Sequence, residues 1–419
     1  MADPSVLKIG FLPLTDALPL IVAQEKGFFA QQGLTVSLER MNSWAQVRDM
    51  LAVGDIDAAH MLAPMVPASW LDGAYGGESF VTALSLNLNG NAITVSNALY
   101  DELVAADADA MAERPVSARA MRKLIAKRIE DGREPPAIGA VFPYSSHNYA
   151  VRYWLGAEGI NPDRDVRMVM APPPLMVEQL EQGQIDAFCV GEPWNSYAER
   201  RGSGRTIVLM KEIWRHFPEK VLGVRAGWAA SNNDTHLALL RAVLLALQWL
   251  DQPKHRREAA YMLSLPDYVG LSPTLFMPAL LGEGVLRDRK SLLEEDDALI
   301  FHHYAANFPW KSHALWFLTQ MVRWGQVAVP QDIVAVAEQG YRPDLYRLAA
   351  RAVGVSAPMS DQKIEGGHDR AWIMTDADEP IAMPRSRFID NALFDPRAPG
   401  RYVESFVRHN MRVTVDELG

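Results

Sequence analysis

The stretch from Lys8 to Met61 decides the fold and reads KIGFLPLTDALPLIVAQEKGFFAQQGLTVSLERMNSWAQVRDMLAVGDIDAAHM. Short apolar runs alternate in it with runs whose apolar residues recur at helical spacing. We expect strands at Lys8–Leu12, Leu34–Leu38 and Ile56–Met61, and helices at Leu18–Ala30 and Ser43–Val53. This β-α-β-α-β order predicts a mostly parallel sheet with helices on both faces.

The same alternation returns further along the chain. Strand patterns lie at Ile138–Phe142, Val166–Met170 and Ala187–Val190, and helical patterns at His147–Ala157, Leu175–Gln182 and Pro193–Arg200. We therefore expect an α/β protein with two lobes that form a clamshell. Lobe I is expected to hold residues 1–92 and 221–419, lobe II residues 93–220, with a ligand in the cleft between them.

The last third of the chain has a different character. Residues 256–352 are mostly helical in pattern, including Asp297–Asn307 and Ser312–Trp324, whereas residues 354–394 are rich in Gly, Pro, Asp and Ser. We expect a helical C-terminal extension on lobe I, ending in a segment that wraps over that lobe or is partly mobile.

Composition restricts the class of partner. The 419 residues carry a formal net charge of -10 without a block of like charges. This argues against direct binding to nucleic acid or to an anionic membrane. The sequence also has no apolar run of membrane-spanning length and begins without the pattern of an export signal. We therefore expect a cytoplasmic protein.

The motifs of several enzyme classes are missing. There is no G-x-S-x-G elbow, no G-x-x-x-x-G-K-[ST] loop and no H-E-x-x-H helix. His302, His303 and His313 lack the cysteine or acidic partners and the spacing of a zinc site. We expect a protein that is not an enzyme and that holds neither a metal nor a cofactor.

Polar and aromatic residues gather where the expected strands end, which is where ligands sit in open α/β sheets. They supply the donors that a small anion needs: an indole N–H, an amide, a histidine at a helix start, a close-lying backbone and an ammonium group. The residues are Trp44, Asn91, Ser146, His147, Gly191, Glu192, Trp194 and Lys220.

Each of these residues also has a purely structural explanation. Trp44 can pack into lobe I, and Asn91 can belong to an ordinary Asn-Gly-Asn turn. The residues before His147 can simply cap a helix. A lone lysine such as Lys220 is usually a solvated surface charge.

Several longer strings resemble one family. They include Ile9-Gly-Phe-Leu-Pro-Leu-Thr-Asp, Ser43-Trp-Ala, Asn87-Leu-Asn-Gly, Phe188-Cys-Val-Gly-Glu-Pro-Trp-Asn, Pro218-Glu-Lys and Arg323-Trp-Gly. In this order they look like the NrtA/NasS/CmpA family of nitrate- and bicarbonate-binding clamshell proteins, which are related to the solute receptors of ABC importers. The resemblance covers nearly the whole chain.

The resemblance implies roles for the cleft residues. It places anion contacts at Trp44, Asn91, His147, Gly191 and Lys220. We expect Ser146, Glu192 and Trp194 to lie behind these contacts and support them. The family more often has Gln where this chain has Asn91. Because the bicarbonate-binding members have an acidic residue at the position of Lys220, the resemblance favours nitrate or nitrite.

The resemblance also implies a biological role. Without an export signal, the chain is similar to the NasS type of cytoplasmic sensor. In that type, binding of nitrate or nitrite releases a partner, the NasT-like RNA-binding antiterminator of the ANTAR class. The alternative is a periplasmic or lipid-anchored receptor that delivers nitrate to an ABC importer, recorded without its signal peptide.

Overall fold

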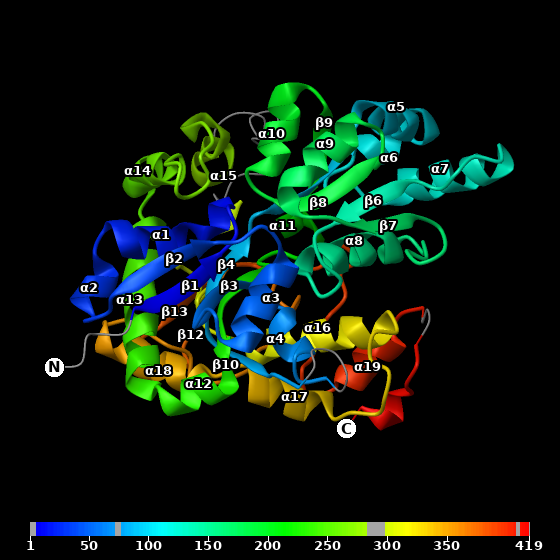
Figure 1. Cartoon of the computed structure of the whole chain (residues 1–419). Helices are drawn as coiled ribbons and strands as arrows, with labels where there is room; N and C mark the ends of the chain where they lie inside the picture. Colours follow the sequence, from blue (N-terminus) through cyan, green and yellow to red (C-terminus); the bar gives the residue numbers. More distant parts are fainter. Residues whose placement is uncertain (1–5, 72–76, 283–297, 408–410, 419) are drawn as a thin grey trace.

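The computed structural model describes residues 6–71, 77–282, 298–407 and 411–418. It contains two α/β lobes, each built on its own sheet (Figure 1). The chain passes from the first sheet to the second at Gly90 and returns between residues 209 and 218. Gly90 has a φ of 98°, and a side chain there would meet Leu299 at 2.7 Å. This crossing therefore requires glycine.

The sheet of lobe I has the strand order β11-β4-β10-β3-β1-β2. Its strands are β1 (Leu7–Phe11), β2 (Val36–Arg40), β3 (Ala58–Leu62), β4 (Phe80–Asn89), β10 (Pro218–Arg225) and β11 (Leu299–Ile300). The helices around it are α1 (Leu18–Glu25), α2 (Phe28–Gln31), α3 (Trp44–Val53), α4 (Met65–Ala68), α12 (Ala226–Ser231), α13 (Asn233–Asp251), α14 (Pro253–Leu263) and α15 (Met277–Leu281).

The sheet of lobe II has the strand order β7-β6-β8-β5-β9. Its strands are β5 (Asn91–Ser96), β6 (Ala137–Ala140), β7 (Arg167–Met170), β8 (Ala187–Gly191) and β9 (Gly204–Leu209). Its helices are α5 (Asn97–Ala106), α6 (Ala108–Ala112), α7 (Arg119–Glu130), α8 (Ser146–Ala157), α9 (Met176–Glu181), α10 (Trp194–Arg201) and α11 (Met210–Ile213).

Both sheets are mixed, so the expectation of mostly parallel sheets holds for only part of each. Strand β1 pairs in parallel with β2 and β3, and β6 pairs in parallel with β7 and β8. In contrast, β10 lies antiparallel between β3 and β4, and β5 lies antiparallel between β8 and β9. Strands β5 and β10 are the first strands after the two crossings. They are not part of the β-α-β units whose crossovers make neighbouring strands parallel.

Two expected helices differ from the structure. The helix expected at Leu18–Ala30 is divided into α1 and α2, because Gly27 between them has a φ of 72°. The segment Asp297–Asn307 was expected to be helical, and Asp297 lies outside the described residues. From residue 298 onward the segment forms β11 and turns, because Ile300 pairs with Leu88 at the edge of β4.

The C-terminal extension contacts both lobes. It contains α16 (Lys311–Arg323), α17 (Ile333–Gly340), α18 (Pro343–Ala352), the hairpin β12 (Trp372–Met374) and β13 (Ile381–Met383), and α19 (Pro399–Glu404). In Figure 1, α16 lies between lobe I and α8 of lobe II. The ring centroids of Tyr153 on α8 and Trp316 on α16 are 5.8 Å apart, and those of Tyr149 and Phe317 are 5.9 Å apart. The extension is therefore not confined to lobe I.

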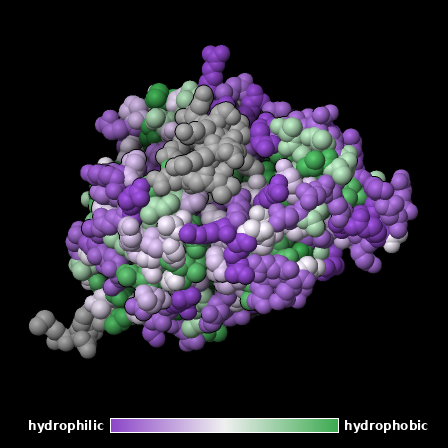
Figure 2. Space-filling view, turned by 90° about the horizontal axis from the view of Figure 1, so that it is seen from above, coloured by the Kyte–Doolittle hydropathy of each residue, from purple (hydrophilic) through white to green (hydrophobic). Residues whose placement is uncertain are grey.

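The large apolar side chains lie mainly in the two cores. On the face shown in Figure 2, hydrophobic residues are scattered in small groups among hydrophilic ones. No helix within the described part of the chain combines the length and the apolar character needed to cross a membrane.

The contact between α16 and α8 gives a prediction about stability. Trp316 is fully buried, and its indole Nε1 donates a hydrogen bond to the Tyr402 hydroxyl at 3.0 Å. Replacing it in Trp316→Ala should lower the free energy of unfolding by about 3–5 kcal/mol, through lost burial and a new cavity. Urea denaturation followed by circular dichroism measures this. The matched control Tyr261→Ala, at a residue that is 58% exposed, should change it by less than about 0.5 kcal/mol; equal effects would contradict the role assigned to Trp316.

Candidate functional site

Lys220 lies at the centre of a buried polar cluster between the lobes. It belongs to β10, where it pairs with Leu62 of β3 and Asn87 of β4. The register between β10 and β4 shifts on both sides of Lys220. Such irregularities re-aim side chains on a strand. At this irregular part of β10, the side chains of the consecutive residues Glu219 and Lys220 both point into the cluster and contact each other.

Asp16 and His60 complete the lobe I side of the cluster. Asp16 lies in the 3-10 turn η1 (Thr15–Ala17) that follows β1, and its Oδ2 is 2.8 Å from the Lys220 Nζ. Its Oδ1 is 3.1 Å from Nε2 of His60 on β3. Trp44, the first residue of α3, packs edge to face against the His60 ring at 5.3 Å, and the Lys220 Nζ lies 5.3 Å from the centre of the indole ring.

Lobe II contributes the start of α8. Ser145 caps this helix by accepting a hydrogen bond from the Asn148 N–H at 3.0 Å. Because Ser145 fills the capping position, the Ser146 hydroxyl is available for a different contact. It donates a hydrogen bond to the Glu219 carboxylate. The other oxygen of Glu219 contacts Lys220 and lies 3.6 Å from Nε2 of His147. Glu219 therefore joins Lys220 of lobe I to the two residues at the start of α8.

Gly191 and Asn91 approach the cluster from the sheet of lobe II, where they face each other across β5 and β8. A Cβ atom at Gly191 would lie 3.1 Å from Oδ1 of Asn91 and 3.5 Å from Oδ2 of Asp16. Because glycine has no side chain, the backbone at residue 191 can lie close to Asn91 and Asp16. The Asn91 amide donates to the sulfur of Met210 at 3.4 Å, which is a weak acceptor.

The side chains of Glu192 and Trp194 make their contacts with residues of α10. The Glu192 carbonyl accepts a hydrogen bond from the Thr15 N–H at 2.8 Å, which joins the two lobes beside Asp16. Its carboxylate turns to α10, where it accepts from the Ser196 N–H at 3.1 Å, and burial raises its pKa to about 7. Trp194 packs against Tyr197 of its own helix, with the ring centres 5.8 Å apart.

The cluster is almost completely shielded from water. Lys220 and His147 have no exposed surface, and Asp16 is 2% exposed. Burial alone lowers the pKa of Lys220, but the charges of Asp16 and Glu219 outweigh burial and raise it. Burial raises the pKa of Asp16, yet Lys220 and His60 together hold it well below its usual range. Asp16 and Lys220 are therefore both charged at neutral pH.

The two histidines behave differently. Burial lowers the pKa of His147 to about 4, and the nearby Glu219 offsets this only in part. Burial also lowers the pKa of His60, against the opposing effect of Asp16. Both imidazoles are therefore neutral at neutral pH in this closed arrangement.

Several buried donors around Lys220 have no acceptor. The Nε1 of Trp44 makes no hydrogen bond among the described residues, and neither ring nitrogen of His147 does. Buried donors are normally satisfied. A small bound anion with acceptor oxygens would satisfy these donors. The ammonium group of Lys220 beside them supplies a positive charge for such an anion.

Asp16, His60 and Glu219 are the site residues that sequence reasoning missed. Each carried a signal: Asp16 follows the first strand within Leu-Thr-Asp, and His60 interrupts an otherwise apolar strand. Glu219 is the direct neighbour of Lys220. An ionisable residue that a strand buries needs a partner, and this rule points to all three.

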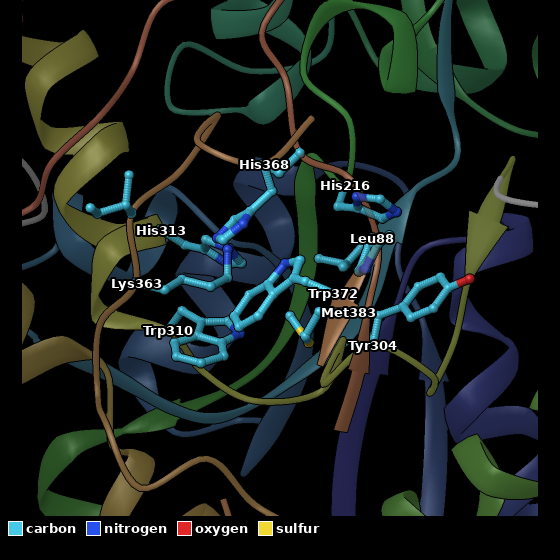
Figure 3. A pocket seen from close by; sticks show the side chains of 12 residues that line it. Leu88, His216, Tyr304, Trp310, His313, Lys363, His368, Trp372 and Met383 are labelled. Atoms are coloured by element: carbon cyan, nitrogen blue, oxygen red, sulfur yellow. The ribbon is translucent and has the colours of Figure 1, made fainter. Parts of the chain in front are cut away.

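The histidines considered for a metal site are dispersed. Nδ1 of His302 contacts Oδ1 of Asn307 at 2.7 Å, and Nδ1 of His303 contacts Oδ1 of Asp251 at 2.6 Å. His313 lines a separate pocket with Lys363, where the C-terminal segment crosses lobe I (Figure 3). Among the described residues, no three His, Cys, Asp or Glu side chains are grouped so that they could hold a metal ion.

Comparisons with known proteins agree on one family. The model of the NMT1-like family matches residues 1–264. The nitrate/nitrite binding protein NrtA of Synechococcus elongatus is 34% identical over 94% of this chain and 85% of its own length. The crystal structure of the periplasmic nitrate-binding protein NrtA from Synechocystis superposes with a TM-score of 0.82 at 30% identity, covering 97% of this chain and 99% of that one.

Other relatives are longer proteins. The nitrate import ATP-binding protein NrtC of Synechocystis is 36% identical over 96% of this chain but only 55% of its own length. The bicarbonate transport ATP-binding protein CmpC of the same organism is 38% identical over 90% of this chain and 54% of its own. The chain thus spans about half the length of these two relatives.

The Asp16–Lys220 pair gives a second prediction. Replacing one partner of a buried ion pair leaves the other uncompensated, so Asp16→Asn should lower the free energy of unfolding at pH 7 by roughly 3–5 kcal/mol. Because the pKa of Asp16 is lowered by folding, its stabilisation is present above the unfolded pKa of about 3.9 and is lost as pH falls further. The difference between the two proteins should therefore shrink at acidic pH.

Urea denaturation at pH 7 and at pH 2.5, well below the unfolded pKa of Asp16, measures both effects. Asp131→Asn is the matched control, because Asp131 makes an exposed pair with Lys127 at 3.0 Å. Exposed pairs of this kind contribute about 0.5 kcal/mol or less. Equal losses of unfolding free energy in the two variants would contradict the stabilising role assigned to the Asp16–Lys220 pair.

Proposed function

The chain belongs to the NMT1-like family, and from this premise we propose that it is a binding protein, not an enzyme, that takes nitrate or nitrite between its lobes. Its similarity to NrtA over most of both chains supports this proposal. The cleft adds independent support. One observation carries it: the buried ammonium of Lys220 lies beside the unsatisfied Trp44 Nε1 and the unsatisfied nitrogens of His147.

Nitrate matches this set of donors. It is a planar monoanion that offers three acceptor oxygens and no hydrogen. The indole N–H of Trp44, the ammonium of Lys220 and an N–H of His147 can donate to its oxygens. Asn91 can add a donor if its amide turns, because its Nδ2 donates to Met210 and its free atom is Oδ1. Nitrite offers two acceptor oxygens and the same charge, so it can use most of the same contacts.

Bicarbonate differs from nitrate by one hydrogen. Its hydroxyl is a donor and requires an acceptor in the site. Oδ1 of Asn91 and one ring nitrogen of neutral His147 make no hydrogen bond among the described residues and could accept it. The preference for nitrate or nitrite is therefore proposed from Lys220, because the sequence resemblance places an acidic residue at this position in the bicarbonate-binding members.

We also propose how binding is used. Thr15 and Glu192, and Ser146 and Glu219, are hydrogen-bonded across the lobes, so an anion enclosed here stabilises the closed form. In a cytoplasmic sensor of the NasS type, a partner such as an ANTAR-class RNA-binding antiterminator would bind the open form. Nitrate would then release it, and each ligand would weaken the other by the same factor. The sequence resemblance to NasS supports this role.

The second candidate is a receptor that delivers nitrate to an ABC importer. The names of NrtC and CmpC, an import and a transport protein, favour it. Size-exclusion chromatography of the purified chain with the ANTAR-class antiterminator of the same organism separates the two roles. A complex that nitrate dissociates supports the sensor, and the absence of a complex at micromolar concentrations contradicts it.

Anion binding itself is tested by isothermal titration calorimetry. The purified chain is titrated with nitrate, nitrite and bicarbonate in a cationic amine buffer of constant chloride content. We expect one saturable site for nitrate or nitrite, with bicarbonate much weaker. Binding of bicarbonate alone would overturn the proposed ligand.

Charge reversal at Lys220 sharpens this test. Lys220→Glu replaces the ammonium that contacts Asp16 and Glu219 by a third carboxyl group, so nitrate affinity should fall at least about 100-fold. The matched control Lys254→Glu makes the same change of charge on an exposed residue of α14 and should leave affinity unchanged. Undiminished affinity in Lys220→Glu, with an unchanged circular dichroism spectrum, would remove Lys220 from the site.

A further inference from the structure

The charges around Lys220 do not favour an incoming anion. Asp16 and Glu219 both contact the single ammonium group of Lys220. The cluster thus sets two carboxyl side chains against one ammonium group before any ligand arrives. A monoanion would add a further negative charge in a space whose side chains are at most a few per cent exposed. Uncompensated charge of this size is costly when it is shielded from water.

His147 offers the geometry that resolves this conflict. Its Nε2 faces an oxygen of Glu219 at 3.6 Å, and neither ring nitrogen makes a hydrogen bond. A neutral imidazole has one N–H, whereas the imidazolium has two. Only the imidazolium can donate to Glu219 and to a bound anion at the same time, because both are acceptors. We propose that this site takes up one proton on His147 with each nitrate, so that the bound species are an anion and an imidazolium.

The charged groups that act on His147 come from two other elements. From β10 these are Glu219 and Lys220, and from η1 it is Asp16. Strand β8 and helix α11 also contact α8. Strand β8 contributes the buried thiol of Cys189, whose pKa burial raises, and α11 contributes Lys211 and Glu212.

The proton balance is simple. Nitrate is the base of a strong acid and brings no proton, so the proton comes from the buffer and goes to a ring nitrogen of His147. Because the pKa of His147 is about 4 in the unliganded site, one ring nitrogen is unprotonated at pH 6 and can accept this proton. Binding of the anion raises the pKa, because a nearby negative charge favours the imidazolium.

The inference rests on the proposed function, and calorimetry separates the two. Nitrate is titrated into the full chain at pH 6 in two cationic amine buffers with different heats of ionisation and the same chloride concentration. The difference in heat should correspond to about one proton taken up per nitrate. Above pH 6 the Kd should rise up to about tenfold per pH unit, as linkage requires.

Three variants assign the proton. His147→Gln keeps an amide donor but cannot titrate, so nitrate should bind more weakly, with no proton uptake and no pH dependence. His60→Gln tests the other cleft histidine and should retain the uptake. His236→Gln is the matched control: burial lowers the pKa of His236 to about 4 as well, but it lies on α13 against Trp228, and both affinity and uptake should be unchanged.

Each outcome is decisive. Nitrate binding with no proton exchange and a Kd independent of pH overturns the inference and leaves the proposed function intact. Proton uptake that persists in His147→Gln, with a normal circular dichroism spectrum, overturns the assignment to His147. No nitrate binding between pH 5.5 and 8 overturns the proposed function instead.

Discussion

The buried ammonium of Lys220 is the constraint on which the cleft depends. A charge removed from water must be paired and hydrogen-bonded, and Lys220 meets this need with Asp16 and Glu219. Glu219 in turn receives the hydroxyl of Ser146 from lobe II. One set of charges therefore holds together the first turn after β1, the strand β10 and the start of α8. This set lies where the two lobes meet.

The C-terminal extension fixes the region beside this cluster. Trp214 and Phe217 belong to the second crossing, and their rings lie 4.8 and 5.3 Å from that of Trp316 on α16. The crossing is thus packed into the extension, and it leads directly into Glu219 and Lys220 of the buried cluster. Opening of the lobes has to break the hydrogen bonds Thr15–Glu192 and Ser146–Glu219, which an enclosed anion would help to restore.

Local patterns predicted much of the fold and part of the site. Ser43 caps α3 as its sequence indicates and places Trp44 at the cleft, and the first and second α/β series follow the apolar periodicity. Strand partners are not encoded by periodicity, so the antiparallel insertion of β10 was missed, and with it the contact between Lys220 and Asp16. The strand-end positions and the resemblance pointed to the same anion contacts, and whether these residues bind nitrate stays a prediction.

The two carboxylates also bear on which anions the proposed site would accept. A site with only Lys220 and polar donors would attract sulfate or phosphate more strongly than nitrate, because a dianion gains more from each positive charge. Asp16 and Glu219 oppose that advantage, because two carboxyl groups face the single ammonium group of Lys220. A monoanion accompanied by one proton keeps the buried net charge unchanged, whereas a dianion would need two protons. Under the proposed function, the carboxylates thus act against dianionic competitors and leave monoanions as the ligands that this site would accept.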